Sequence, residues 1–453
     1  MKAIGIDIGT SGCKGVLVEF PDGRVLRTAR RDYPLHAEGN RAEHDPEDWI
    51  TAVTGILSEL GPADAIGMDG MMHSEVVLDR TGRAVGRAIL WCDGRSEKEC
   101  AEINRKAGRA LLRKTVGNMA FAGFTLPHLL WRKKNGQLKG TAVALCKDYV
   151  RARLTGVLRH EISDASGMIT WHLSKGRWAT EVLRKVGIDP GLFPRPCGST
   201  EIAGTWNGIP VVGGAADNAA AAVGLGVVRK GQAVASMGTS NVLLAVHDRP
   251  VVDPEMRVHT FAHAVPKKFL QLGCMLTGTR SFNWILEVLG EKVESAPIAE
   301  DSKGLLFAPY LVGERTPYAD TTVRGMFAGL SPDHGRGHFV RAVMEGTAFA
   351  LRDAQEIMKA TSVRVTGGGM KSPVWRQIIA DVLGIPVVTV NTSDEGAAFG
   401  SAILAAVGVG AFRSVEEATD RIVQETSVTR PGRSYDREYA RFRKLYPAAK
   451  SLT

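Results

Sequence analysis

The sequence predicts an α/β protein of two domains, and three observations support this fold class. At 453 residues the chain is too long for one hydrophobic core. Strand-like and helix-like patterns alternate in both halves. A turn of glycine and small hydroxyl residues follows an apolar strand at 9–11, and a second follows another strand at 238–240. This repetition predicts a boundary near residue 225, with domains 1–225 and 226–453.

The first half opens with a strand meander. Residues 3–8 and 13–20 read as apolar strands, and the Pro-Asp-Gly turn at 21–23 precedes a third strand over 24–35. A helix is expected to begin at Asp45-Pro46, because aspartate is a preferred N-cap and proline suits the first helical position. Another short strand is expected over 65–68.

The middle of the chain, roughly 93–208, is less regular. It contains a helical pattern over 101–112 and an aromatic segment over 171–178. We expect this region to be an insertion that forms the substrate side of a cleft.

A new start follows with a strand at 209–214, which leads through glycines to Asp217 and a helix of small residues. Strands are then expected over 233–237 and 242–247, on either side of the second Gly-Thr-Ser turn. This strand–turn–strand unit is similar to the opening hairpin, which suggests an internal duplication.

The clearest helix of the chain is expected near the C-terminus. Ser372-Pro373 would cap its start and Gly384 would end it. The strand at 363–366 runs into this helix through Gly367, Gly368 and Gly369. A segment without side chains offers a flat surface on which a ribose or purine ring can lie.

The two glycine-hydroxyl turns predict phosphate contacts. A tight turn of this kind lets the backbone approach a phosphate and directs N–H groups at its oxygens. One turn in each half suggests a nucleotide held between the domains. The residues concerned are Gly9, Thr10 and Ser11 in the first turn and Gly238, Thr239 and Ser240 in the second.

Two carboxylates, Asp7 and Asp217, each lie where a strand meets a glycine-rich bend. Phosphoryl transfer to a hydroxyl needs one carboxylate to accept the proton and another to help hold Mg²⁺ on the nucleotide. Asp217, before a helix, suits the base. Asp7, beside the first turn, suits the metal through bound water, because Mg²⁺ keeps several of its waters.

Composition excludes several other classes. The net charge of +9 is spread along the chain without an aromatic platform, so nucleic acid is not the expected partner. The six cysteines form no C-x-x-C pair, which argues against zinc ligation and a disulfide scaffold. No signal-peptide pattern opens the chain, and its longest apolar run is too short for a membrane span. We therefore expect a cytoplasmic protein that does not contact membranes.

Two common nucleotide-binding motifs are missing from the sequence. The sequence has no Gly-Lys dipeptide, so a Walker A loop is excluded, and no G-x-G-x-x-G motif opens a helix after the first strand. Neither a Walker-type NTPase nor a dinucleotide dehydrogenase fits this pattern.

Together these segments resemble the FGGY family of carbohydrate kinases, within the sugar kinase, actin and heat-shock ATPase superfamily. The segments that carry the resemblance are 5–11, 213–220, 236–240, 313–317 and 367–377. The resemblance covers nearly the whole chain. It implies a ribonuclease H-like fold in each domain, an ATP cleft between the domains, and Mg²⁺ as the metal.

The resemblance also implies roles for individual residues. Asp217 and Asp7 would be catalytic, with Asp7 reaching the metal through water. The implied sugar-binding residues are Met72, His73, Asp93, Arg95, Asp217 and Asn218. The implied nucleotide-binding residues are Gly9, Thr10, Ser11, Lys14, Gly238, Thr239, Ser240, Gly367, Gly368, Gly369 and Ser372.

Within the family the motifs are most similar to those of xylulose kinases, which implies transfer of phosphate from ATP to D-xylulose. Met72-His73 and the stretch 91–95 carry this similarity. His128 stands where family members often have lysine, and Cys92 replaces a common amide. Met-His-Ser at 72–74 also occurs in gluconate kinases, so kinases for ribulose, gluconate or another polyol remain alternatives.

A more distant alternative is a protein with the same fold but a different function. An actin- or chaperone-like ATPase would use the same superfamily fold, since fold alone does not decide function. It would hydrolyse ATP slowly and ignore small sugars. Relatives are often dimers, so a homodimer is a further expectation.

Overall fold

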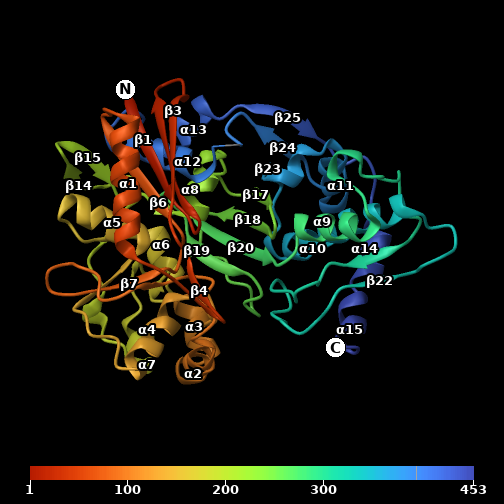
Figure 1. Cartoon of the computed structure of the whole chain (residues 1–453), viewed down its shortest axis with the longest axis horizontal. Coiled ribbons are helices and arrows are strands. Elements are labelled where there is room, and N and C mark those ends of the chain that lie inside the picture. The colour runs from red at the N-terminus through yellow and green to blue at the C-terminus, as the bar shows by residue number, and fades with distance from the viewer. Residues whose placement is uncertain (394) are drawn as a thin grey trace.

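A computed structural model describes residues 1–393 and 395–453, and each half of the chain contributes one large mixed sheet (Figure 1). The first sheet has the spatial order β14 (Ile202–Trp206), β15 (Ile209–Val212), β6 (Ala65–Gly70), β1 (Lys2–Ile8), β2 (Gly12–Glu19) and β3 (Arg24–Asp32), with β16 (Ala215–Ala216) also paired to β6. The second has the order β19 (His259–Ala262), β20 (Phe269–Met275), β18 (Asn241–His247), β17 (Gln232–Met237), β23 (Ser362–Thr366), β24 (Val387–Val390) and β25 (Glu425–Thr429).

The two sheets repeat one topology. β1 forms an antiparallel hairpin with β2 and a parallel pair with β6. In the same way β17 forms an antiparallel hairpin with β18 and a parallel pair with β23. The Gly-hydroxyl turns at 9–11 and 238–240 therefore occupy equivalent positions, at the end of the first strand of each unit. This agrees with the internal duplication suggested by the sequence.

Smaller sheets complete each half. A five-stranded sheet has the order β4 (His36–Glu38), β5 (Arg41–His44), β8 (Ala88–Ile89), β7 (Glu75–Leu78) and β9 (Ala142–Leu145). The two-stranded pairs are β10 (His160–Glu161) with β13 (Pro196–Cys197), β11 (Trp171–His172) with β12 (Arg177–Trp178), and β21 (Leu306–Ala308) with β22 (Met326–Ala328).

Helices cover the sheets. Those of the first half are α1 (Pro46–Leu60), α2 (Glu97–Ala107), α3 (Arg109–Thr115), α4 (Thr125–Lys134), α5 (Cys146–Thr155), α6 (Ile162–Gly167), α7 (Thr180–Val186) and α8 (Asp217–Gly224). Those of the second half are α9 (Thr279–Leu289), α10 (Arg336–Met358), α11 (Pro373–Leu383), α12 (Gly396–Gly408), α13 (Val415–Ile422), α14 (Asp436–Phe442) and α15 (Leu445–Lys450).

Two helix predictions are confirmed in detail. The Asp45 side chain accepts a hydrogen bond from the Glu47 N–H at the start of α1, and Pro46 is the first helical residue. Ser372 caps α11 in the same manner, and Gly384 ends it in the left-handed conformation. The single helix expected over 101–112 is wrong, because Gly108, with φ of 80°, separates α2 from α3.

Helix α12 belongs to the second half of the chain but packs on the sheet of the first half, against β1 and β6 and beside α8 (Figure 1). Glycines allow this close approach. A Cβ on Gly5 would lie 1.8 Å from the carbonyl oxygen of Ala398, and one on Gly400 would lie 1.9 Å from that of Ala220. The two halves are therefore joined through a helix contact that admits no side chain at either position.

Candidate active site

Two carboxylates lie side by side at the ends of β1 and β6. Asp7 and Asp69 are opposite each other in the parallel ladder, and Asp69 is fully buried and accepts a hydrogen bond of 2.7 Å from the Ser401 hydroxyl. Burial, followed by the charge of Asp7, raises the pKa of Asp69 well above its usual range. Burial also raises the pKa of Asp7, against the hydrogen bond with Asp69 and the charge of Lys14, which lower it. The pKa is therefore raised more strongly for Asp69 than for Asp7.

Asp217 is the first residue of α8, and its carboxylate faces the same region. Its Oδ1 accepts hydrogen bonds from the backbone N–H of Asn218 at 2.7 Å and from the Asn218 side-chain amide at 2.9 Å. Burial, followed by the negative charge of Asp7, raises the pKa of Asp217 to about 7. A carboxylate with such a pKa is a stronger base than an exposed one and is still available in the ionised form near neutrality.

A buried polar network fixes the start of α8. The Ser163 hydroxyl accepts a hydrogen bond of 3.0 Å from the N–H of Ala216 and donates one of 2.7 Å to Glu161. Behind it the fully buried Lys147 ammonium forms ion pairs with Asp148, Asp164 and Glu161 at 3.1, 3.0 and 3.7 Å. Because every charge has a partner, this network can hold the backbone before Asp217 in one position.

A cavity of about 500 Å³ opens beside Asp217. Its wall contains the predicted sugar-binding residues Met72, His73, Asp217 and Asn218, together with Thr239 and Ser240 of the second turn. The remaining lining residues are Trp91, Phe124, Val242, His259, Phe261, Leu272, Cys274, Leu276, Arg280, Val312 and Arg315. Apolar and aromatic walls with a few polar groups are typical of a small-molecule site.

His73 is held in an unusual backbone conformation within this wall. Its φ is 67°, and its ring stacks on Phe124 with 4.2 Å between the ring centres. Nδ1 lies 2.8 Å from the carbonyl oxygen of Gly167. Left-handed backbone at a non-glycine residue costs about 1–3 kcal/mol and is concentrated at functional sites.

The structure does not bring Asp93 and Arg95 to this wall. The Asp93 carboxylate is buried and accepts hydrogen bonds from the Ala42 N–H and from Arg95. The Arg95 guanidinium is also paired with Glu43 and lies over the Trp131 ring. Both side chains have their hydrogen-bonding groups engaged with protein partners, so their placement favours a structural role over contact with the sugar.

The two sequence departures also lie away from the cavity lining. His128 is buried within α4, where its ring nitrogens have no hydrogen-bond partner among the described residues. Burial lowers its pKa to about 3, so the ring is neutral. Cys92 is exposed and free.

The first glycine-hydroxyl turn contacts Trp91, which is a residue of the cavity wall. Gly9 donates its N–H to the carbonyl of Gly12, which closes the turn, and the Thr10 hydroxyl accepts a hydrogen bond of 2.9 Å from the Trp91 indole. Ser11 is exposed at the tip. Lys14 follows in β2, opposite Asp7, and its ammonium lies 3.1 Å from the Glu395 carboxylate of the other half.

The second turn is bonded to the start of helix α9. The carbonyls of Thr239 and Gly238 accept hydrogen bonds of 2.8 Å from the N–H groups of Gly278 and Thr279. Arg280 follows directly, is exposed, and lines the same cavity as Thr239 and Ser240. This side of the cavity therefore combines a phosphate-type turn with a cation.

A smaller cavity of about 190 Å³ continues from Asp217 toward the second sheet. It is lined by Asp217, Asn218, Ala221, Val234, Ser236, Val242, Leu244, Thr366 and Ala397. Thr366 ends the strand that precedes the three glycines. Asp217 and Asn218 line both cavities, so the carboxylate stands where the two spaces meet.

The three glycines and Ser372 form the last predicted segment. Gly367 has a φ of 95°, and a Cβ there would lie 2.6 Å from the Met237 carbonyl oxygen, so only glycine fits. A Cβ on Gly368 would meet nothing within 4 Å, which leaves an open surface beside it, whereas Gly369 is tightly packed. The Ser372 hydroxyl is engaged as the cap of α11.

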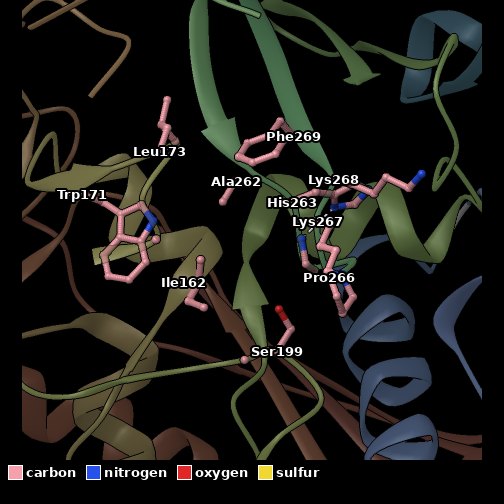
Figure 2. A pocket seen from close by; sticks show the side chains of 13 residues that line it. Ile162, Trp171, Leu173, Ser199, Ala262, His263, Pro266, Lys267, Lys268 and Phe269 are labelled. Carbon is pink, nitrogen blue, oxygen red and sulfur yellow. Dashed lines mark hydrogen bonds between the residues drawn. The ribbon is translucent and has the colours of Figure 1, made fainter. Parts of the chain in front are cut away.

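Another cavity, of about 230 Å³, shares no lining residue with the site (Figure 2). Figure 2 shows the rings of Trp171 and Phe269 and the side chain of Leu173 around it, with Lys267 and Lys268 at one side. Its wall contains no carboxylate.

No three His, Cys, Asp or Glu side chains in residues 1–393 and 395–453 are arranged to hold a metal ion together. None of the helices in these ranges has the length and apolar character that a bilayer crossing requires. All six cysteines are free thiols in this structure.

Each half contains an α/β sheet of the same topology with a phosphate-type turn after its first strand. Asp217 lines two adjacent cavities. These features are typical of the class of two-domain small-molecule kinases. Two protein-family models match the chain and support this class. The model of the N-terminal domain of the FGGY family of carbohydrate kinases matches residues 2–224, and that of its C-terminal domain matches residues 233–409. The chain belongs to the FGGY family of carbohydrate kinases, which use ATP to phosphorylate small sugars.

Relatives and solved structures support the same assignment. The xylulose kinase of Bacillus subtilis is 35% identical, over 98% of this chain and 95% of that protein. A xylulose kinase structure from Rhodospirillum rubrum superimposes with a TM-score of 0.91 at 28% identity, over 100% and 99% of the two chains. A gluconate kinase structure from Lactobacillus acidophilus has a TM-score of 0.89 at 26% identity, over 100% and 97%.

Sequence reasoning did not identify several residues of the site. Asp69 follows an apolar strand and precedes a glycine, which is the same signal that identified Asp7. Arg315 lies in a family segment, but nothing in the sequence shows which way its side chain points. His259 and Arg280 carry no local signal, because only the fold brings them to the cavity.

Proposed function

We propose that this kinase phosphorylates D-xylulose at its terminal hydroxyl and releases D-xylulose 5-phosphate and ADP. The observation that carries the proposal is the position of Asp217, which lines both the cavity of Met72 and His73 and the one that leads toward the glycines at 367–369. The sugar hydroxyl and the γ-phosphate would meet there. The names of the relatives cited above support xylulose as the acceptor.

Asp217 would accept the proton of the hydroxyl as its oxygen attacks the γ-phosphorus. The hydrogen bonds from Asn218 orient the carboxylate, and a positioned general base typically accelerates such a step by about 10²- to 10⁴-fold. N–H groups of the two glycine-hydroxyl turns would stabilise charge on the transferring phosphoryl oxygens. The surface beside Gly368 would hold the adenosine.

The residues present fit Mg²⁺ as the expected metal. Asp7 lies beside the first glycine-hydroxyl turn and offers carboxylate oxygens, which are the ligands that this cation prefers. We propose that Asp7 holds Mg²⁺ through bound water. When bound, the ion would neutralise charge on the nucleotide phosphates.

Coupled ADP release with Mg-ATP tests the acceptor. The panel contains D-xylulose, D-ribulose, L-ribulose, L-xylulose, gluconate, glycerol and xylitol. A single high specificity constant for D-xylulose is expected, and strong turnover of another member would replace the substrate but keep the kinase. An Asp217→Ala enzyme with near-normal turnover would contradict the base assignment.

One observation favours a second candidate. Arg315 lines the cavity, and a sugar acid such as gluconate would place its carboxylate against such a cation. The similar fold of the gluconate kinase from Lactobacillus acidophilus keeps this candidate in the panel. The division at residue 225, the cytoplasmic location and the homodimer stay predictions.

A further inference from the structure

Arg315 is positioned rigidly at the sugar side of the cavity. Its guanidinium carbon lies 5.2 Å from the ring centre of Phe121 and 5.9 Å from that of Phe124. The preceding residue anchors the backbone, because the Glu314 carboxylate accepts the N–H groups of Leu276 and Arg315 at 2.9 and 2.8 Å. A planar cation stacked on two rings is held in place without using its N–H groups.

The charge of Arg315 is unpaired among the residues that the structure describes. Within residues 1–393 and 395–453, its guanidinium forms no ion pair and no hydrogen bond. The side chain is half-buried and lines the same cavity as Met72 and His73. Arginine carries five donors and no acceptor. Its donors are therefore available to an oxygen of the bound sugar.

His73 presents a hydrogen-bond acceptor to the cavity, whereas Arg315 presents donors. A carbonyl oxygen can only accept, so the contact of Nδ1 with Gly167 requires the proton to be on Nδ1. Burial, followed by the charge of Arg315, lowers the pKa of His73 to about 3, which keeps the ring neutral. Nε2 has no hydrogen-bond partner among the described residues and, without a proton, can only accept.

Arg315 can only donate hydrogen bonds and Nε2 of His73 can only accept one, so the two residues together select the hydrogen-bonding groups of the ligand. The group facing Arg315 must be an oxygen that accepts, and the group facing His73 must be a hydroxyl that donates. Apolar side chains such as Phe124, Phe261 and Leu272 surround them. A hydroxyl in place of the accepting oxygen would have its own proton to satisfy in these surroundings, and an unpaired buried donor is costly.

The chemistry of a 2-ketose matches this pattern. The furanose ring of a 2-pentulose is closed by its C5 hydroxyl, so transfer to that hydroxyl requires the open chain with a free C2 carbonyl. The carbonyl oxygen accepts and cannot donate, and the hydroxyls beside it can donate. The geometry points to Arg315 as a specificity-determining residue that donates to the C2 carbonyl of an open-chain 2-ketose, while His73 accepts from a neighbouring hydroxyl.

This inference rests on the proposed function, and it predicts how strongly the enzyme prefers D-xylulose to xylitol. Xylitol differs from D-xylulose by a hydroxyl in place of the carbonyl. The ratio of the two specificity constants therefore reports the contact to Arg315. Loss of a hydrogen bond from a charged donor lowers the specificity constant by about 10- to 100-fold.

The experiment compares the full-length wild type with Arg315→Met and Arg315→Lys. Arg249→Met is the matched control, because Arg249 is exposed and has no ion pair or hydrogen bond among the described residues. ADP release is measured with D-xylulose, D-ribulose, xylitol and gluconate. The KM for ATP and the unfolding midpoint are recorded for each protein, and sugar binding without ATP is followed by tryptophan fluorescence, since Trp91 lines the cavity.

For Arg315→Met we expect the D-xylulose specificity constant to fall by about 10- to 100-fold and that of xylitol by less than about threefold. The KM for ATP and the unfolding midpoint should stay unchanged, and Arg315→Lys should be intermediate. An equal loss on both acceptors, or an unchanged ratio, would overturn the inference while the proposed function stands. A wild type that uses D-ribulose but not D-xylulose, and loses it in Arg315→Met, would correct the substrate and keep the inference. A wild type active only on polyols or sugar acids would overturn both.

Discussion

Replacing Asp217 with asparagine should remove the activity and stabilise the fold at alkaline pH. The neutral amide keeps an oxygen that can accept the two hydrogen bonds from Asn218, so local structure should be retained. A general base removed from the reacting hydroxyl costs about 10²- to 10⁴-fold in turnover. The expected gain in stability has a separate cause. In the wild type the buried Asp217 carboxylate becomes charged at high pH, and asparagine removes that charge.

The magnitude follows from the pKa of Asp217, which burial and the charge of Asp7 raise from 3.8 to about 7. Between these two values the folded state binds more protons than the unfolded state, so the wild type loses stability as the pH rises through this window. Asparagine has no such dependence. Each pH unit in the window corresponds to about 1.4 kcal/mol. From about pH 5 to about pH 8 the difference between variant and wild type should therefore grow by about 2 to 3 kcal/mol in favour of the variant.

Urea unfolding at several pH values measures the difference, and coupled ADP release measures turnover. Asp22→Asn is the control, because Asp22 is exposed in a turn and its replacement should change neither quantity. A pH-independent difference between Asp217→Asn and the wild type would refute the account of the buried charge. Retention of more than about a tenth of the turnover would refute the role as base.

Two further predictions concern the fold around the site. Gly5→Ala should lower the free energy of unfolding by about 1–3 kcal/mol or more, because its Cβ would lie 1.8 Å from the Ala398 carbonyl oxygen and push α12 from β1. Gly55→Ala in α1, where the nearest atom is 3.6 Å away, is the control, and urea unfolding that does not distinguish the two would contradict the packing. Lys147→Met should lower the free energy of unfolding by about 3–5 kcal/mol, since it removes the cation that the buried Asp164 and Glu161 share. Denaturation at neutral pH checks this, and a loss below about 1 kcal/mol would show that the network is not a source of stability.

Much of the local structure could be predicted from the sequence, because the signals are local. Alternating apolar residues predicted the hairpin of β1 and β2, and the caps at Asp45 and Ser372 predicted the starts of α1 and α11. The single helix predicted over 101–112 is wrong, because Gly108 ends α2 and α3 begins after it. The repeated strand–turn–strand pattern also identified the turn that contains Thr239, which lies on the cavity wall.

The sequence by itself determined the two-domain α/β class, the places of the glycine-hydroxyl turns, and the two carboxylates that each lie where a strand meets a glycine-rich bend. Each of these features depends on residues that are neighbours in the chain. The tertiary structure alone decided which distant side chains share the cavity. His73 and Arg315 are far apart in sequence, yet both line the cavity. Asp93 and Arg95 lie outside its lining and are paired with each other. The same holds for α12, which packs on the sheet of the other half. Such contacts depend on how the sheets and helices pack, and local patterns of hydrophobicity and turn residues do not encode the direction in which a given side chain points.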